Sequence, residues 1–244
     1  MTHPRLDTAW RATGPYVAVN ASKTGLLDET QQFLRLYAQR DDLAAVRRQL
    51  VDGGLPQRAR ATRQTIVEVI SRRLTAWQPP SWVLADLASF ANAPNLDSLK
   101  AALLLHGARQ DQLLYDVVQR VIVPGWLEGQ REISRGQVQR FLDQAQPTHP
   151  EIDGWSRETR EKLAGNLLSI LRDDGLLSGR ATKTIVEPIV PPEVAAHLVH
   201  LLSAEGVAPG ELTAHPDWRL WLWDCERVAR VLSTLPNSLE VVRA

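Results

Sequence analysis

Residues 131–190 read REISRGQVQRFLDQAQPTHPEIDGWSRETREKLAGNLLSILRDDGLLSGRATKTIVEPIV. A short extended piece precedes Ser134, and serine at this point can cap a helix by accepting a backbone N–H. A proline-rich turn follows at residues 147–150, and Ser156 can cap a second, longer helix. β-branched residues then alternate with polar ones over residues 182–190, which is typical of a small hairpin. This order predicts a winged-helix-like unit.

The residues before this unit have the apolar spacing of helices. Ile66, Ile70, Leu74 and Trp77, for example, fall on one helical face. The pattern predicts helices at residues 26–39, 41–52, 62–78, 82–90 and 99–123. The sequence therefore predicts a mainly α fold, with an N-terminal helical domain at residues 1–95 that carries a basic helix-turn-helix-like segment, and the winged-helix-like domain at residues 96–190.

The C-terminal residues 191–244 are predicted to form a tryptophan-rich helical appendage. Trp218, Trp221 and Trp223 crowd one segment. Most of these rings are expected in the core, but an exposed tryptophan patch would instead mark a protein interface, because such rings dominate interface energetics. The single cysteine, Cys225, is expected to be a buried structural thiol.

Charge is unevenly distributed along the chain. The 244 residues carry 28 basic and 28 acidic groups, which argues against a wholly basic nucleic-acid coat. Residues 1–80 carry 12 basic and 7 acidic groups, a net charge of +5. The longest uncharged stretch has 12 residues, whereas a membrane span needs about 20. No secretory signal pattern is present, so we expect a cytoplasmic protein with no membrane partner.

Catalytic and cofactor motifs are absent from the sequence. Neither G-x-x-x-x-G-K-[ST] nor G-x-G-x-x-G occurs. Glu193, His197 and His200 share one helical face, but no fourth metal ligand is evident nearby, and two packed histidines are the simpler interpretation. The sequence therefore predicts a protein that is not an enzyme and that carries no cofactor and no metal.

Three arginines gather at the start of the helix that begins near Thr62. Arg58, Arg60 and Arg63 lie where a helix N-terminus already carries about half a positive charge. A phosphate would reverse this local repulsion, since free N–H groups and guanidiniums would then both attract it. The alternative is a solvated cluster neutralised by acids elsewhere in the fold.

A second set of cations lies in the winged-helix-like unit. In such folds the N-terminal residues of the second helix of the motif reach DNA. Here those residues are Arg157, Arg160 and Lys162, and the hairpin would add Arg180 and Lys183.

Several features of the same helix weigh against DNA contact. Glu158 and Glu161 would repel phosphate, and Arg160 falls toward the apolar stripe. Gly165, in mid-helix, suggests close approach of another backbone, since glycine there costs about 1 kcal/mol relative to alanine. Winged helices also serve as protein-docking modules.

Three segments of the chain resemble the BrxA family, the small component of BREX bacteriophage-exclusion systems. They are Ala21–Glu29 (ASKTGLLDE), Arg58–Ile66 (RARATRQTI) and Trp155–Thr159 (WSRET), the last continuing to Asp174–Leu177. The resemblance covers residues 16–180. It implies a mainly helical, non-enzymatic accessory protein in a system that marks host DNA by methylation and blocks phage replication, from a family associated with nucleic-acid binding.

Together these observations predict an accessory protein that binds double-stranded DNA and has other BREX defence proteins as partners. The rival hypothesis is a protein-interaction adaptor that docks through the tryptophan-rich C-terminus and has no intrinsic affinity for DNA. RNA binding by the helical N-terminal half is a third possibility.

Overall fold

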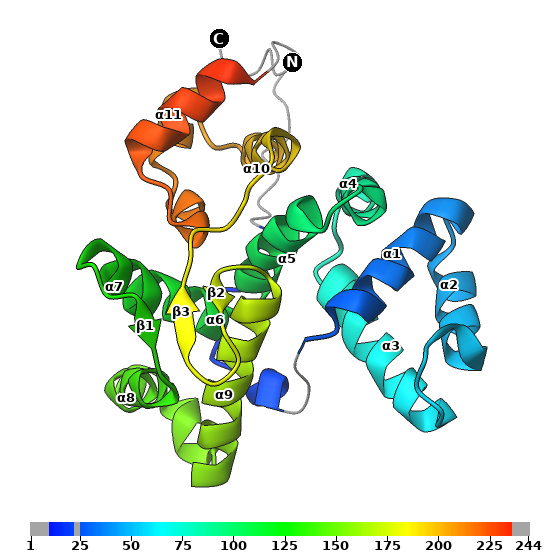
Figure 1. Ribbon diagram of the computed structural model, residues 1–244, viewed down its shortest axis with the longest axis horizontal. Helices are drawn as coiled ribbons and strands as arrows, with labels where there is room; N and C mark the ends of the chain where they lie inside the picture. The colour runs from blue at the N-terminus through cyan, green and yellow to red at the C-terminus, as the bar shows by residue number, and fades with distance from the viewer. Residues whose placement is uncertain (1–9, 22–24, 236–244) are drawn as a thin grey trace.

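The structure is a computed structural model that describes residues 10–21 and 25–235. Its elements gather in three groups, namely α1–α4, α5–α9 with a small sheet, and α10–α11 (Figure 1). The predicted mainly α fold is confirmed. Residues 22–24 of the first BrxA-like segment, and the ends of the predicted first and last domains, lie outside the described residues.

The first group follows the apolar spacing closely. Its helices are α1 (Leu27–Arg40), α2 (Leu43–Gln49) with a final π-turn η2 (Leu50–Gly54), α3 (Arg60–Thr75) and α4 (Ser81–Asn92). A short 3-10 turn, η1 (Ala18–Ala21), precedes them. The Asp42 carboxylate caps α2 by accepting the N–H groups of Ala44 and Ala45 at 2.8 and 3.0 Å. The predicted helices of this region are thus all present.

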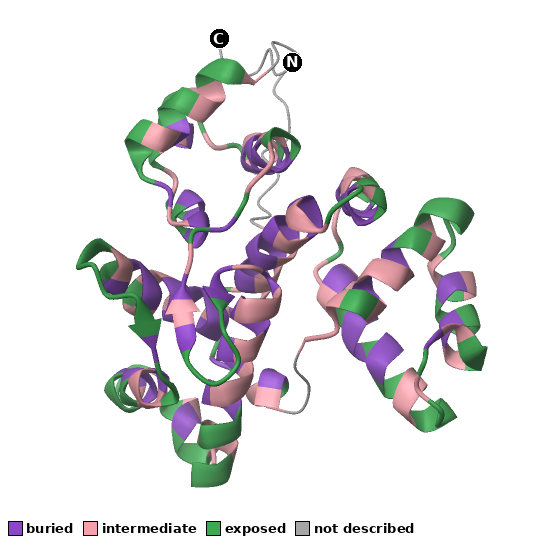
Figure 2. Cartoon of the chain, viewed as in Figure 1, coloured by how far each residue is buried: buried purple, intermediate pink, exposed green. Residues whose placement is uncertain are grey.

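The prediction of a single helix over residues 99–123 is wrong. The structure has α5 (Asp97–Gln110), α6 (Gln112–Val117), the π-turn η3 (Val118–Ile122) and α7 (Val123–Leu127). Asp111 causes the break, because its extended backbone ends α5 and its side chain accepts the Leu114 N–H at 3.1 Å, which starts α6. Figure 2 shows buried residues concentrated along α5, which is the centre of the core.

The predicted order of residues 131–190 is observed. The elements are β1 (Glu132–Ile133), α8 (Arg135–Ala145), the 3-10 turn η4 (Pro150–Gly154), α9 (Arg157–Asp173), β2 (Leu177–Ser178) and β3 (Lys183–Ile185). The strands form an antiparallel sheet in the order β1-β3-β2. The hairpin is shorter than predicted, because β3 ends at Ile185.

The C-terminal group packs its tryptophans inside. It comprises α10 (Pro192–Ala204), the 3-10 turns η5 (Pro209–Ala214) and η6 (Pro216–Trp221), and α11 (Cys225–Thr234). The rings of Trp218, Trp221 and Trp223 are buried against one another. The alternative of an exposed patch is therefore wrong for these three rings. The prediction of a buried thiol is also wrong, because Cys225, the first residue of α11, is exposed.

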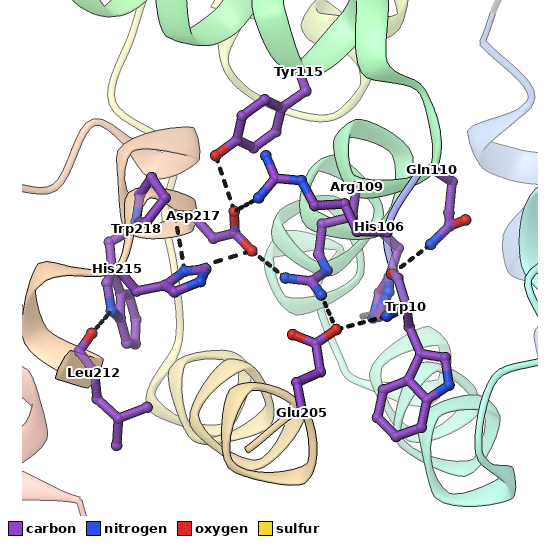
Figure 3. Close-up of polar contacts among 12 residues, drawn as sticks. Trp10, His106, Arg109, Gln110, Tyr115, Glu205, Leu212, His215, Asp217 and Trp218 are labelled. Atoms are coloured by element: carbon purple, nitrogen blue, oxygen red, sulfur yellow. Dashed lines mark hydrogen bonds and ion pairs between the residues drawn. The ribbon is translucent and has the colours of Figure 1, made fainter. Parts of the chain in front are cut away.

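A buried ion network fastens the C-terminal group to α5 (Figure 3). Arg109, on α5, pairs with both Glu205 and Asp217 and is 2% exposed. The Tyr115 hydroxyl donates to Asp217 at 3.2 Å, and the backbone N–H of Trp10 donates to Glu205 at 2.9 Å. The network thus joins the N-terminal segment, α5, α6 and the C-terminal turns.

Among the described residues, the helices are too short or too polar to cross a lipid bilayer.

Candidate nucleic-acid interface

The three arginines before and within the first turn of α3 do not act as one free cluster. Arg63 is used by the chain itself: its Nε donates to the Val51 carbonyl at 2.7 Å and its Nη1 to those of Gln57 and Arg58 at 2.7 and 2.8 Å. Arg60 forms an exposed ion pair with Asp52 at 3.3 Å. Only Arg58 has a side chain without a hydrogen bond or ion pair, among the described residues of this trio.

The alternative of a cluster neutralised by acids applies only to Arg60, through Asp52, whereas backbone carbonyls hold Arg63. The physical reason is the irregular turn before α3, whose carbonyls need donors that Arg63 supplies. Arg60 instead contributes to a groove of about 620 Å³ between α2 and α3. The charged residues of that groove are Arg47, Arg48, Asp52, Arg60, Glu68 and Arg72.

The cations at the start of α9 are paired along their own helix. Arg157 Nε lies 2.8 Å from Glu161, and Lys162 Nζ lies 2.7 Å from Glu158. The hydrogen bond to Glu161 raises the pKa of Arg157, and the hydrogen bond from Lys162 lowers the pKa of Glu158. In the exposed first turns of α9, the charges of Arg157 and Lys162 are thus matched by those of Glu161 and Glu158.

Arg160 is held on the other side of α9. Its Nε donates to the Trp155 carbonyl at 3.2 Å, and its Nη1 lies 3.7 Å from Asp143 on α8. This agrees with its position toward the apolar stripe, and the guanidinium helps to join α8 to α9.

The two cations of the β2–β3 turn have different environments, because Lys183 is buried and Arg180 is exposed to solvent. Lys183 is buried, and its Nζ donates to the carbonyls of Gly179 and Arg180 at 2.9 and 2.5 Å. Gly179 has a φ of 82°, and a β-carbon there would stand 2.2 Å from the Thr182 carbonyl oxygen, so the tight turn requires glycine. Arg180 is exposed and its guanidinium has no hydrogen bond or ion pair within the described chain.

A larger basic groove, of about 950 Å³, opens between this turn, the β1–α8 junction and the C-terminal half of α9. Its cationic lining residues, which define the basic groove below, are Arg131, Arg135, Arg172, Arg180 and Lys183. Glu132 is the one acidic residue in the lining, counted over the described part of the chain. The sequence predicted Arg180 and Lys183 of this set, but not Arg131, Arg135 or Arg172.

Arg135 lines the basic groove and has a free guanidinium. It is the first residue of α8, whose first turn holds no acidic side chain. Its guanidinium has no hydrogen bond or ion pair among the described residues. Gly165 makes room for it, because a β-carbon at that position would stand 3.1 Å from Arg135 Nε. The close approach that Gly165 suggested is thus by this side chain and not by another backbone.

The other two arginines are partly engaged. Arg172 donates twice to Asp173, at 2.8 and 2.5 Å. Arg131 stacks on the Trp126 ring, with its guanidinium carbon 4.1 Å from the ring centre. Burial, with the nearby charges of Arg172 and Arg135, lowers the pKa of Lys183. Cations therefore outnumber anions in the basic groove, which favours binding of a polyanion.

The helical face that carries Glu193, His197 and His200 is occupied by other contacts. Glu193 accepts a hydrogen bond from Ser98, and the His200 ring stacks on Trp82. Within the ranges 10–21 and 25–235, no group of three or more His, Cys, Asp or Glu side chains could hold a metal ion.

Comparisons with known proteins give a matching family and a solved structure of similar fold. A family model described as BrxA matches residues 14–201, well over half of the chain. A crystal structure of an uncharacterized protein from Magnetospirillum magneticum has a similar fold, with a TM-score of 0.62 and 18% sequence identity. The match covers 79% of this chain and 96% of that chain. No curated protein matches the sequence.

The match to the family model agrees with the resemblance seen in the three sequence segments, and it extends from the turn before η1 into α10. The chain therefore belongs to the BrxA family and is a BREX-associated protein.

Proposed function

We propose that this protein is a non-enzymatic accessory component of a BREX system that binds double-stranded DNA through residues 131–190, with backbone phosphates seated in the basic groove. The observation that carries the proposal is the pair Arg135 and Arg180, two guanidiniums without a hydrogen bond or ion pair in the described chain, which line one groove. Guanidiniums in such a setting match phosphate oxygens bidentately.

The arrangement of elements supports this proposal. A strand, two helices and two further strands follow one another in this order, and the three strands form one sheet, which resembles the arrangement of a winged helix. In that motif the second helix faces the major groove. Here this helix is α9, and the β2–β3 turn with Arg180 is the wing beside it.

The balanced start of α9 favours binding to the backbone over base readout. The pairs Arg157–Glu161 and Lys162–Glu158 are exposed, and water and salt screen such surface pairs strongly. Arg157 and Lys162 can therefore exchange their glutamates for phosphates at small cost, but the glutamates remain nearby. We expect affinity with little sequence preference, because phosphate contacts carry no base information.

The adaptor hypothesis loses its proposed surface, since Trp218, Trp221 and Trp223 are buried. The N-terminal groove between α2 and α3, with Arg60 in its lining, is a second surface on which the same duplex could lie.

A titration of the purified full chain with a fluorescent DNA duplex at several salt concentrations tests the proposal. Binding to phosphates predicts a linear fall of log affinity with log salt concentration. An RNA duplex of the same sequence serves as the comparison. Absence of binding at low salt would favour the adaptor, and tighter binding of RNA would favour the third possibility.

A further inference from the structure

A cavity of about 410 Å³ lies between the N-terminal helices α1 and α3 and the central helices α5, α6 and α9. Each of these five helices contributes an apolar side chain to its walls, namely Leu27, Ile70, Leu103, Leu114 and Ile170. The volume is within the roughly 300–1,000 Å³ of small-molecule sites, which are mostly apolar and contain a few polar groups that fix the ligand. The basic groove shares no lining residue with this cavity.

The cavity is open to solvent beside η1. Val17 and Val19 belong to its lining, and they are 46% and 37% exposed. An apolar molecule can therefore enter from this side without separation of the helices.

Asp174 lines this cavity with a carboxyl group that lacks a partner. Among the described residues, the carboxyl accepts no hydrogen bond and forms no ion pair. Asp174 is 9% exposed. The fully enclosed side-chain atoms without a partner in the described chain belong to Gln57, Trp77, His106 and Trp223, so both carboxyl oxygens of Asp174 keep accessible surface. A ligand in the cavity can thus reach this carboxyl.

The position of Asp174 is unfavourable for a negative charge. Asp174 is the C-cap of α9, and a helix C-terminus already carries about half a negative charge. Burial, with the charge of Asp173, raises the pKa of Asp174 to about 7. A buried group with a perturbed pKa in a cleft is a candidate for a functional site.

The nearby cations do not neutralise Asp174 by direct contact. Arg73 and Lys100 oppose the rise of its pKa, but neither forms an ion pair with it. Arg73 instead donates to Asn20 Oδ1 at 2.9 Å and to the Gly25 carbonyl at 3.2 Å. The carboxylate of Asp174 therefore has room for a further cation.

The other charged residues of the lining are Asp111 and Arg72. Asp111 already has partners, because its Oδ2 accepts from Asn20 at 2.6 Å and its Oδ1 accepts the Leu114 N–H at 3.1 Å. Arg72 is exposed and also lines the groove between α2 and α3. Asp174 is therefore the carboxyl of this lining that is available to a ligand.

We propose that this cavity binds a small apolar primary amine, whose ammonium group donates to the Asp174 carboxylate while its hydrocarbon part lies against the apolar walls. An ammonium supplies a positive charge and three N–H donors, which is what a buried, unpaired carboxylate requires. An alcohol of the same size would supply one donor and no charge, and a carboxylate would be repelled. The proposal does not depend on DNA binding, because the basic groove consists of other residues.

Isothermal titration calorimetry of the full chain with hexylamine, hexan-1-ol and hexanoate tests the proposal. These probes share one hydrocarbon chain length and differ in the head group. We expect saturable binding of hexylamine, about tenfold or more tighter than binding of hexan-1-ol, because a hydrogen bond to a charged group is stronger than one between neutral groups. The proposal is overturned if hexylamine does not bind at millimolar concentration, or if hexan-1-ol or hexanoate binds as tightly.

Proton release shows which carboxyl forms the pair. Hexylamine stays protonated, since an alkylammonium resembles lysine, whose pKa is about 10.4. The pKa of Asp174 is about 7 in the unliganded protein, so binding should release about half a proton per amine at pH 7 and almost none at pH 9. Binding heats in two buffers of different ionisation enthalpy measure this release. A release that does not fall between pH 7 and pH 9 would contradict pairing with Asp174.

Two variants and a control test the assignment of the site. Asp174→Asn keeps the shape of the side chain but removes its charge, and it should weaken hexylamine binding by about tenfold or more. Asp173→Asn is the matched control, because Asp173 is the neighbouring carboxylate and is not part of the lining, and its affinity should stay close to that of the natural chain. Leu103→Trp, which fills the cavity from α5, should abolish binding and tests the same site if Asp174→Asn does not fold. Full affinity in Asp174→Asn or Leu103→Trp, or equal losses in Asp174→Asn and Asp173→Asn, would contradict the proposal.

Discussion

The Arg135 guanidinium lies against the one glycine within α9, Gly165, with Nε 3.1 Å from where a β-carbon would stand. Gly165→Ala should therefore displace the Arg135 guanidinium by a few tenths of an ångström within the basic groove. The same change should stabilise α9, because alanine is favoured over glycine in a helix interior by about 1 kcal/mol. We expect a higher melting temperature together with weaker binding of duplex DNA. A stabilised variant with unchanged DNA affinity would show that the position of Arg135 is irrelevant to binding.

Arg63 is expected to act on stability more than on DNA. Its guanidinium donates to three backbone carbonyls of the turn before α3. A hydrogen bond that involves a charged group contributes about 1.5–3 kcal/mol net of exchange with water, and less where it is exposed. Arg63→Gln should lower the free energy of unfolding by about 1–3 kcal/mol. Arg58→Gln is the matched control and should leave stability unchanged in a denaturant titration. Equal stability of the two variants would contradict this assignment.

Asp174 should make stability depend on pH. Burial, with the charge of Asp173, raises the pKa of Asp174 to about 7, although Arg73 and Lys100 oppose the shift. In the unfolded chain its pKa is about 3.9, so between these values the folded state keeps a proton that the unfolded state has lost. This contribution is complete below the unfolded pKa and is lost as pH rises through 7.

Asp174→Asn mimics the protonated carboxyl at every pH. Its stability relative to the natural chain should rise between pH 5 and pH 8, by up to about 3 kcal/mol. Thermal unfolding of both proteins across that range measures the difference. A difference that stays constant with pH would exclude a perturbed Asp174.

The buried ion network should be essential for docking of the C-terminal group. Arg109→Met leaves Glu205 and Asp217 without their main cation in a buried site, which typically costs about 3–5 kcal/mol. Arg11→Met removes a more exposed partner of Asp217 and should cost less. Chemical denaturation of the two variants compares the losses, and a milder effect for Arg109→Met would argue against the network.

Local signals explain what the sequence predicted well. Ser134 and Ser156 stand at helix starts, and prolines or glycines mark the helix ends, so the order of elements in residues 131–190 followed from neighbouring residues alone. The break at Asp111 escaped prediction because it lies inside an apolar run and depends on one side-chain cap. Local sequence therefore predicts elements better than the turns that interrupt them.

The basic groove depends on contacts between distant parts of the chain. Arg131 and Arg135 come beside Arg180 because β1 pairs with β3, with Ile133 opposite Lys183. That register is not visible in the spacing of charges along the sequence. The structural role of Arg63 was not predicted for a similar reason. Its partners are backbone carbonyls, and their direction depends on how the turn folds. The sequence signals that pointed to this site were the mid-helix Gly165 and the hairpin cations Arg180 and Lys183.

The most direct test of the account compares two double variants of equal charge in a DNA titration across salt concentrations. Arg135→Gln with Arg180→Gln removes the two free guanidiniums of the basic groove, whereas Arg219→Gln with Arg230→Gln removes two exposed charges from the C-terminal group. The account predicts that the groove variant binds more weakly and loses about 2 from the slope of log affinity against log salt, while the control keeps the natural slope. Equal slopes and affinities for the two variants would contradict the account.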